Sequence, residues 1–114
     1  MFKILIAEDD AELRQLFSRV LTKNGYNVKG VSNGREALDC MENDFFDLII
    51  SDIMMPEVDG YEFVRLLREC NDKTPVLMIT AKDAFDDMRQ GFDSGTDDYM
   101  VKPVNVNEMV LRVG

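Results

Sequence analysis

The sequence predicts an α/β fold: a (βα)5 doubly wound parallel sheet of five strands, with helices on both faces. Apolar stretches alternate along the chain with segments whose apolar residues recur at helical spacing. Three of these stretches, 2–7, 47–52 and 75–80, are apolar over nearly their whole length, as central strands of a parallel sheet are. The connections between such strands are expected to be right-handed crossovers.

The first strand is expected at residues 2–7, and a helix follows it. Asn24-Gly25 is expected to end this helix, because both residues readily adopt the conformation found after a helix. Residues 26–31 then form a short strand, and Ser32 is expected to cap the second helix. The apolar positions of the two helices are Leu13, Leu16, Phe17, Val20 and Leu21, then Ala37, Leu38 and Met41.

The second half of the chain repeats the pattern. The strand at 47–52 runs into a segment typical of a loop, which contains Met54-Met55-Pro56 and Asp59-Gly60. The third helix is expected to bury Phe63, Val64, Leu67 and Cys70.

Two further strands and two further helices complete the predicted fold. A strand is expected at 75–80, and a fourth helix begins among acids, which complement the positive end of the helix dipole. A short strand at 98–101 precedes a last helix that begins near Asn105. The acids are Asp83, Asp86 and Asp87; the apolar positions are Phe85, Met88 and Phe92 in the fourth helix and Val106, Met109, Val110 and Val113 in the last.

The composition indicates one globular domain, residues 1–114, with 46% apolar and 31% charged residues. No apolar run is long enough to span a membrane, and Lys3 interrupts the N-terminus, so no signal peptide is visible. Cys40 and Cys70 are therefore expected to be small buried thiols of a reduced, cytoplasmic protein. The last helical pattern stops without a cap, so we expect truncation within that helix and an output domain, if any, after residue 114.

The charge balance excludes several functions. With 13 basic and 22 acidic residues, the net charge is −9, which argues against direct binding of nucleic acid by this domain. The chain contains no histidine. It therefore has no His-based acid–base catalysis, no His–metal site and no phosphohistidine of its own, and its chemistry depends on carboxylates, hydroxyls and lysine.

Polar residues with useful chemistry stand at the carboxyl ends of four predicted strands. Open α/β sheets bind ligands at this edge. Acids from neighbouring strands can converge there, and clustered carboxylates repel one another unless a cation neutralises them. Mg²⁺ suits oxygen ligands, whereas Zn²⁺ prefers His or Cys. The residues are Glu8, Asp9 and Asp10 after the first strand, Asp52 after the third, Thr80 after the fourth and Lys102 after the fifth.

As an ordered set, these motifs resemble the receiver domain of two-component response regulators. The resemblance spans essentially the whole chain and rests on Ile4 to Asp10, Asp47 to Pro56, Asp59-Gly60, Ile79-Thr80-Ala81 and Lys102-Pro103. It implies a flavodoxin-like sheet with strand order 2-1-3-4-5. It also implies a signalling switch phosphorylated by a sensor histidine kinase in the presence of Mg²⁺, rather than an enzyme acting on other substrates.

The resemblance assigns roles to individual residues. Asp52 is similar to the phosphoacceptor. Asp9 resembles the direct metal ligand, Glu8 the neighbour that acts mainly through water, and Met54 the position whose backbone carbonyl binds the metal. Of the remaining functional positions, Lys102 resembles the lysine that pairs with the phosphoryl group, Thr80 the switch hydroxyl and Tyr99 the switch aromatic.

Within the family, residues 95–99 and Arg112 resemble the winged-helix transcription-factor branch. In that branch, charged residues on the fourth helix, fifth strand and fifth helix pair across an activated homodimer. Val104 departs from the Phe commonly found after the Lys-Pro pair. The candidates for this face are Lys82, Asp97, Asp98 and Arg112.

Each residue also has a simpler interpretation. Adjacent acids often occupy the first turn of a helix, which we expect of Asp10. Asp52 could begin a turn, and Thr80 could cap a helix. Lys102 alone could be a solvated charge, and Tyr99 an ordinary strand residue.

Two other functions fit the sequence less well. A Mg²⁺-dependent phosphatase with an aspartyl nucleophile needs a second Asp two residues later, where this chain has Met54. A flavodoxin-like nucleotide or flavin binder needs amides and glycines after the first strand, where this chain has acids.

Overall fold

In the computed structural model, residues 2–55, 57–80, 98–101 and 105–113 are described. Five parallel strands form one sheet in the order β2-β1-β3-β4-β5, which confirms the predicted fold class and strand order. The strands are β1 (Lys3–Ala7), β2 (Asn27–Val31), β3 (Leu48–Asp52), β4 (Val76–Thr80) and β5 (Asp98–Val101). The central strand β3 pairs with β1 on one side and β4 on the other.

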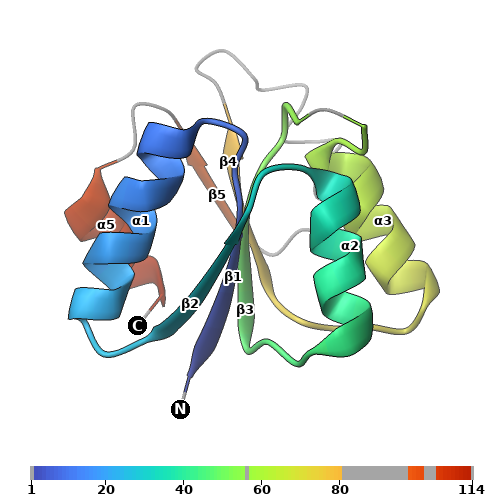
Figure 1. The fold of residues 1–114 in the computed structure, drawn as a ribbon, viewed down its shortest axis with the longest axis horizontal. Coiled ribbons are helices and arrows are strands. Elements are labelled where there is room, and N and C mark those ends of the chain that lie inside the picture. The colour runs from blue at the N-terminus through green and yellow to red at the C-terminus, as the bar shows by residue number, and fades with distance from the viewer. Residues whose placement is uncertain (1, 56, 81–97, 102–104, 114) are drawn as a thin grey trace.

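Helices cover both faces of the sheet (Figure 1). α1 (Ala11–Lys23) and α5 (Val106–Val113) lie on one face, and α2 (Gly34–Asn43) and α3 (Gly60–Glu69) lie on the other. The fourth helix expected from Asp83, Phe85, Asp86, Asp87, Met88 and Phe92 falls outside the described residues.

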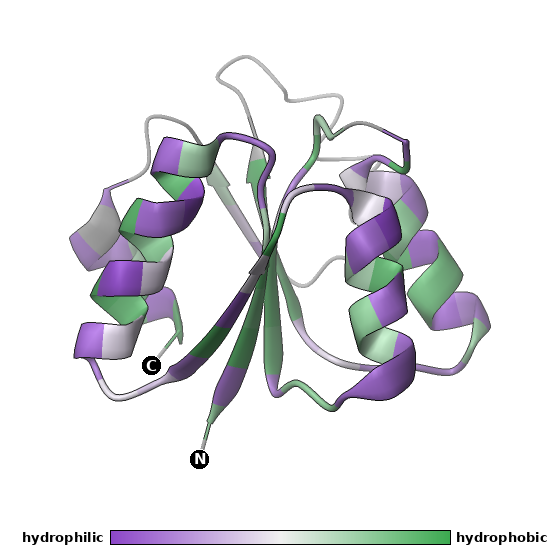
Figure 2. Cartoon of the chain, viewed as in Figure 1, coloured by the Kyte–Doolittle hydropathy of each residue, from purple (hydrophilic) through white to green (hydrophobic). Residues whose placement is uncertain are grey.

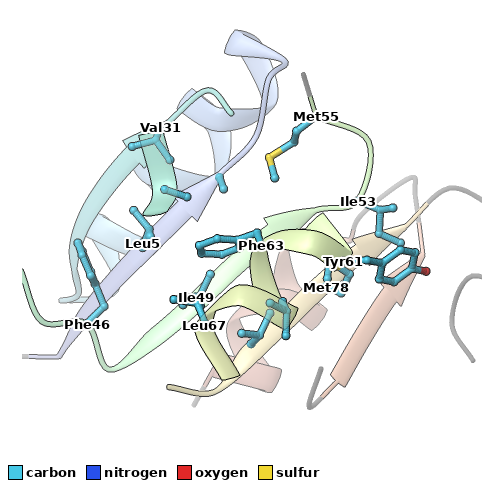
Figure 3. Packing of buried hydrophobic residues seen from close by; sticks show 14 of the residues in the cluster. Leu5, Val31, Phe46, Ile49, Ile53, Met55, Tyr61, Phe63, Leu67 and Met78 are labelled. Carbon is cyan, nitrogen blue, oxygen red and sulfur yellow. The ribbon is translucent and has the colours of Figure 1, made fainter. Parts of the chain in front are cut away.

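Alternate residues of each strand feed two separate cores. In β1, Ile4 and Ile6 pack with Phe17 and Met109 on the α1–α5 face. Leu5 and Ala7 pack on the opposite face, with Phe63 of α3 and Ile49 of β3 among others (Figure 3). Green apolar residues accordingly fill the central strands, while the helices show purple polar residues as well (Figure 2). Because side chains of a strand alternate between the two faces, an apolar strand supplies both cores at once.

The helix ends follow capping chemistry. Asp10, Asn33 and Asp59 are the N-caps of α1, α2 and α3, and the side chain of each accepts a backbone N–H from the first turn. The prediction that Ser32 caps α2 is wrong by one residue. Ser32 instead donates through both its backbone N–H and its hydroxyl to the Glu36 carboxylate.

The predicted end of α1 is confirmed, whereas two residues predicted to be apolar core positions are exposed. α1 ends at Lys23 with Asn24 as C-cap and Gly25 at φ 93°, as predicted. Cys70 is exposed, contrary to prediction, because α3 ends at Glu69 and Cys70 lies beyond its last buried turn. Leu16 is also exposed, whereas its neighbour Phe17 is fully buried. In the described part of the chain, no helix has the length and apolar character needed to cross a membrane.

Candidate functional site

Three carboxylates meet where β1 and β3 end. Ala7 pairs with Ser51 in the parallel register, so the residues that follow β1 lie beside Asp52, the last residue of β3. One carboxylate oxygen from each of Glu8, Asp9 and Asp52 lies within 4.8 Å of the others. This is the edge at which open α/β sheets bind ligands.

Burial makes this cluster chemically distinctive. Glu8 is 1% exposed and Asp52 4% exposed, whereas Asp9 is exposed to solvent. Buried carboxylates that face one another are costly without a compensating cation or hydrogen-bond donors. The donor set consists of carboxylate oxygens, so it fits a hard divalent cation such as Mg²⁺ better than Zn²⁺.

Asp10 lies next to the cluster but has a different role. Its carboxylate accepts the backbone N–H groups of Glu12 and Leu13 at 3.0 and 3.3 Å, which caps α1. Its own N–H donates to Glu8 Oε2 at 3.3 Å. Asp10 therefore links the start of α1 to the buried Glu8 side chain, and the expectation that it serves the helix rather than the acidic site agrees with the geometry.

Arg14 makes a contact with Glu8 that the sequence did not reveal. Its Nη1 donates to the backbone carbonyl of Glu8 at 2.7 Å, although it lies six residues further on, in α1. Its aliphatic stem passes over Gly30 of β2, where a β carbon would lie 3.2 Å from Arg14 Cγ and Cδ. No pattern in a single sequence indicates this pair, because it depends on α1 crossing the end of β1.

The backbone around Asp52 is closely packed. Asp52 pairs with Ile79 of β4, and the Ser51 hydroxyl donates to the Asp52 carbonyl at 3.0 Å. The loop after β3 closes where the Gly60 N–H donates to the Ile53 carbonyl at 2.8 Å. The sequence marked Gly60 only as a turn residue, but here it brings α3 against the phosphoacceptor candidate.

The structure describes the end of β4 but not the residues directly after β5. Thr80 is the last residue of β4 and pairs with Val101 of β5, which places its backbone on the same sheet edge as Asp52. Lys102, directly after Val101, lies outside the described residues.

Tyr99 and Met54 differ sharply in exposure. Tyr99 is 5% exposed and packs in the core on the α2–α3 face. The side chain of this switch candidate is therefore buried. The Met54 side chain is 75% exposed, two residues beyond Asp52.

The candidates for a dimer face are connected within the chain. Arg112 Nη1 donates to Asp98 Oδ2 at 2.6 Å, and Arg112 Nε donates to Glu108 Oε1 at 3.1 Å. The hydrogen bond that Arg112 donates to Asp98, and then the one it donates to Glu108, raise the pKa of the Arg112 guanidinium. These contacts tie β5 to α5. Lys82 and Asp97 fall outside the described residues.

The fold and the acidic strand ends together define a receiver-type domain. A family model described as the response regulator receiver domain matches residues 4–114. The chain belongs to this family.

Known proteins resemble the chain over nearly all of its length. Response regulator MprA of Mycolicibacterium vanbaalenii is 40% identical over 97% of this chain and 48% of its own. Transcriptional regulatory protein TcrA of Mycobacterium tuberculosis is 39% identical over 97% of this chain and 44% of its own. The chain thus spans about half the length of the curated relatives it matches.

Solved structures agree with the fold. The receiver domain of Francisella response regulator 1452 superposes with a TM-score of 0.94 at 34% identity, over 99% of this chain and 93% of that one. Chemotaxis response regulator CheY4 of Vibrio cholerae has a TM-score of 0.91 at 35% identity, over 100% and 99% of the two chains.

Proposed function

We propose that the chain is a phosphorylation-activated switch that accepts a phosphoryl group on Asp52 from a sensor histidine kinase. The observation that carries the proposal is the convergence of Glu8, Asp9 and Asp52 within 4.8 Å at the carboxyl edge of the sheet. A small acyl phosphate could serve as an alternative donor. Family membership supports the same reaction class.

In the proposed reaction, an Asp52 carboxylate oxygen attacks phosphorus. The P–N bond of the kinase phosphohistidine breaks, and its electron pair leaves with the imidazole nitrogen. Glu8, Asp9 and Asp52, with the backbone carbonyl of Met54, would hold Mg²⁺, which supplies positive charge for the phosphoryl oxygens. Glu8 and Asp52 are kept in place by burial, so the acidic edge needs little rearrangement.

Two further residues complete the proposed site. Lys102 neutralises the phosphoryl oxygens as a point charge, and the Thr80 hydroxyl donates a hydrogen bond to one of them. The backbone register supports this, because Thr80 pairs with Val101, the residue before Lys102.

The proposed output is a population shift rather than turnover of a substrate. Drawing Thr80 towards the phosphoryl group lets Tyr99 turn inward and repacks the face formed by the expected fourth helix, β5 and α5. We propose that this face then forms a homodimer and that the output, in a winged-helix domain after residue 114, is transcription in the cytoplasm. The name of TcrA and the greater length of the relatives support this output.

A Mg²⁺-dependent phosphatase is the weaker candidate. Its second aspartate would act as a general acid two residues after the nucleophile, a role that a thioether cannot fill. Met54 occupies that position.

Intact-mass measurement after incubation with acetyl phosphate and Mg²⁺ tests the proposal. The wild type should gain the mass of one phosphoryl group, and Asp52→Asn should gain none. Asp39→Asn, which changes an exposed acid of α2, is the matched control and should behave as wild type. A mass gain that survives Asp52→Asn would rule out Asp52 as the acceptor, and steady hydrolysis of a phosphomonoester would favour the phosphatase.

A further inference from the structure

We propose that Arg14 is a positioning residue of the acidic site: its guanidinium holds the Glu8–Asp9 peptide, and thereby sets the two carboxylates against Asp52. The inference rests on the proposed function, because it concerns the same cation-binding carboxylates. Arg14 itself touches neither the cation nor the phosphoryl group in this scheme.

The chain leaves the sheet at the point where the acidic residues begin. β1 ends at Ala7, and the Glu8 N–H donates to the Val31 carbonyl of the neighbouring strand at 3.0 Å. The next peptide joins Glu8 to Asp9, and its carbonyl oxygen accepts the Arg14 guanidinium at 2.7 Å. Charge-assisted hydrogen bonds of this kind are shorter and stronger than neutral ones.

The first turn of α1 supplies the other restraint on this loop. The Asp10 N–H donates to Glu8 Oε2, and the Asp10 carbonyl accepts the Arg14 N–H at 2.9 Å. The Glu8 side chain and the Glu8–Asp9 peptide are thus both fixed from α1. Displacement of that peptide would move the Asp9 Cα, and with it the Asp9 carboxylate, relative to Asp52.

The surroundings of Arg14 are shaped to hold it. The residue is half-buried, and its stem lies against Gly30, where even a single added carbon would crowd it at 3.2 Å. Arg19, on the same helix, is exposed. The two arginines therefore form a matched pair that differs in contact with the acidic site.

The sign of the charge effect separates positioning from simple electrostatics. A positive guanidinium near a cation site repels the cation, so its removal alone would strengthen Mg²⁺ binding. Arg14→Met keeps much of the stem and removes the charge and the donor. If Arg14 positions the carboxylates, Mg²⁺ binding weakens by about tenfold, as seen when hydrogen-bond partners of metal ligands are lost.

The experiment measures Mg²⁺ affinity by calorimetric titration, with a thermal melt of every variant as the check on folding. We expect about tenfold weaker binding for Arg14→Met, partial recovery for Arg14→Lys, which keeps a charged donor, and no change for Arg19→Met. Equal or tighter binding by Arg14→Met would overturn the inference.

A measurement without metal distinguishes this inference from the proposed function. NMR relaxation of metal-free protein should show lower order parameters for the Asp9 and Asp10 amides in Arg14→Met than in wild type. If the wild type binds no Mg²⁺, the proposed function fails, and lower order at these amides still upholds the role of Arg14. Unchanged order would overturn it. If Arg14→Met does not fold, Gly30→Ala, which displaces the stem, is read by the same two measurements.

Discussion

Gly60 lies so close to Asp52 that a β carbon at position 60 would fall 2.4 Å from the Asp52 carbonyl oxygen. It would also lie 2.9 Å from Ile53 Cα and 3.0 Å from Met78 Sδ. The start of α3 therefore rests directly on the end of β3. Through this contact the position of the phosphoacceptor candidate depends on the residue that begins a helix eight positions later.

Gly60→Ala should lower both stability and reactivity. Crowding a packed backbone costs about 1–3 kcal/mol, so the free energy of unfolding in urea should fall by that amount. Because the methyl group presses on the Asp52 backbone, phosphorylation by acetyl phosphate should slow by about tenfold or more. Wild-type kinetics in the folded variant would show that the contact does not position Asp52.

Gly34→Ala is the control for this substitution. A β carbon at Gly34 would lie 2.0 Å from the Val58 carbonyl, so stability should fall here as well. The crowded group belongs to the loop after β3 and not to Asp52 itself. Gly34→Ala should therefore lose stability, but its phosphorylation rate should be closer to that of the wild type than the rate of Gly60→Ala is.

Met54 should make the phosphorylated state long-lived. Its side chain is 75% exposed beside the site and has no amide or carboxylate that could orient a hydrolytic water. Met54→Asn should raise the rate of label loss by about tenfold, which is less than the roughly 100-fold or more that a positioned acid or base contributes, because an amide only orients the water. The decay of isolated, labelled protein measures this rate. Complete loss of the label from wild type within seconds would contradict the prediction.

The pattern of apolar residues was sufficient to predict the sheet, since central strands and helix stripes depend on local spacing. It failed where neighbouring residues compete for one role. Both Ser32 and Asn33 can cap a helix, and only the backbone decides that Asn33 does so. Cys70 has the right spacing from Leu67 for burial, but the helix has already ended.

The acidic cluster of the site could be predicted from the sequence, but the contacts around it could not. Glu8, Asp9 and Asp52 follow strands that the pattern identifies, so their convergence follows once β1 and β3 are neighbours. The contacts of Arg14 and Gly60 depend on how α1 and α3 cross the strand ends, which no local pattern encodes.

Arg112 should contribute to dimer formation only on activation. In the structure it binds Asp98 and Glu108 of its own chain. A partner chain would have to compete for these exposed groups, and such contacts contribute about 1 kcal/mol or less. With Mg²⁺ and beryllofluoride, wild type should elute as a dimer in gel filtration, and Arg112→Ala should dimerise more weakly.

The matched variant for this experiment is Arg35→Ala, which removes an exposed arginine from α2, on the opposite face of the sheet. It should dimerise as wild type does. A wild type that stays monomeric with beryllofluoride would contradict the proposed dimer.

Glu36 should make a small, pH-dependent contribution to stability. Its Oε1 accepts the Ser32 N–H at 2.8 Å and the Ser32 hydroxyl at 2.5 Å. These bonds, with smaller contributions from Arg14 and Lys29, lower the pKa of Glu36 from its ordinary value of 4.5. A lowered pKa in the folded state means that folding favours the charged carboxylate. The stabilisation is therefore present above the unfolded pKa and is lost as pH falls through the folded pKa.

Glu36→Gln should thus reduce the free energy of unfolding at neutral pH by less than about 1 kcal/mol, since the group is exposed. The difference from wild type should shrink as the solution is made more acidic than the folded pKa, because the wild-type side chain is then neutral as well. Urea denaturation across this pH range measures it. Glu42→Gln, at an exposed position of the same helix, is the control. A difference for Glu36→Gln that stays constant with pH would mean that the Ser32 contact does not depend on the charge of Glu36.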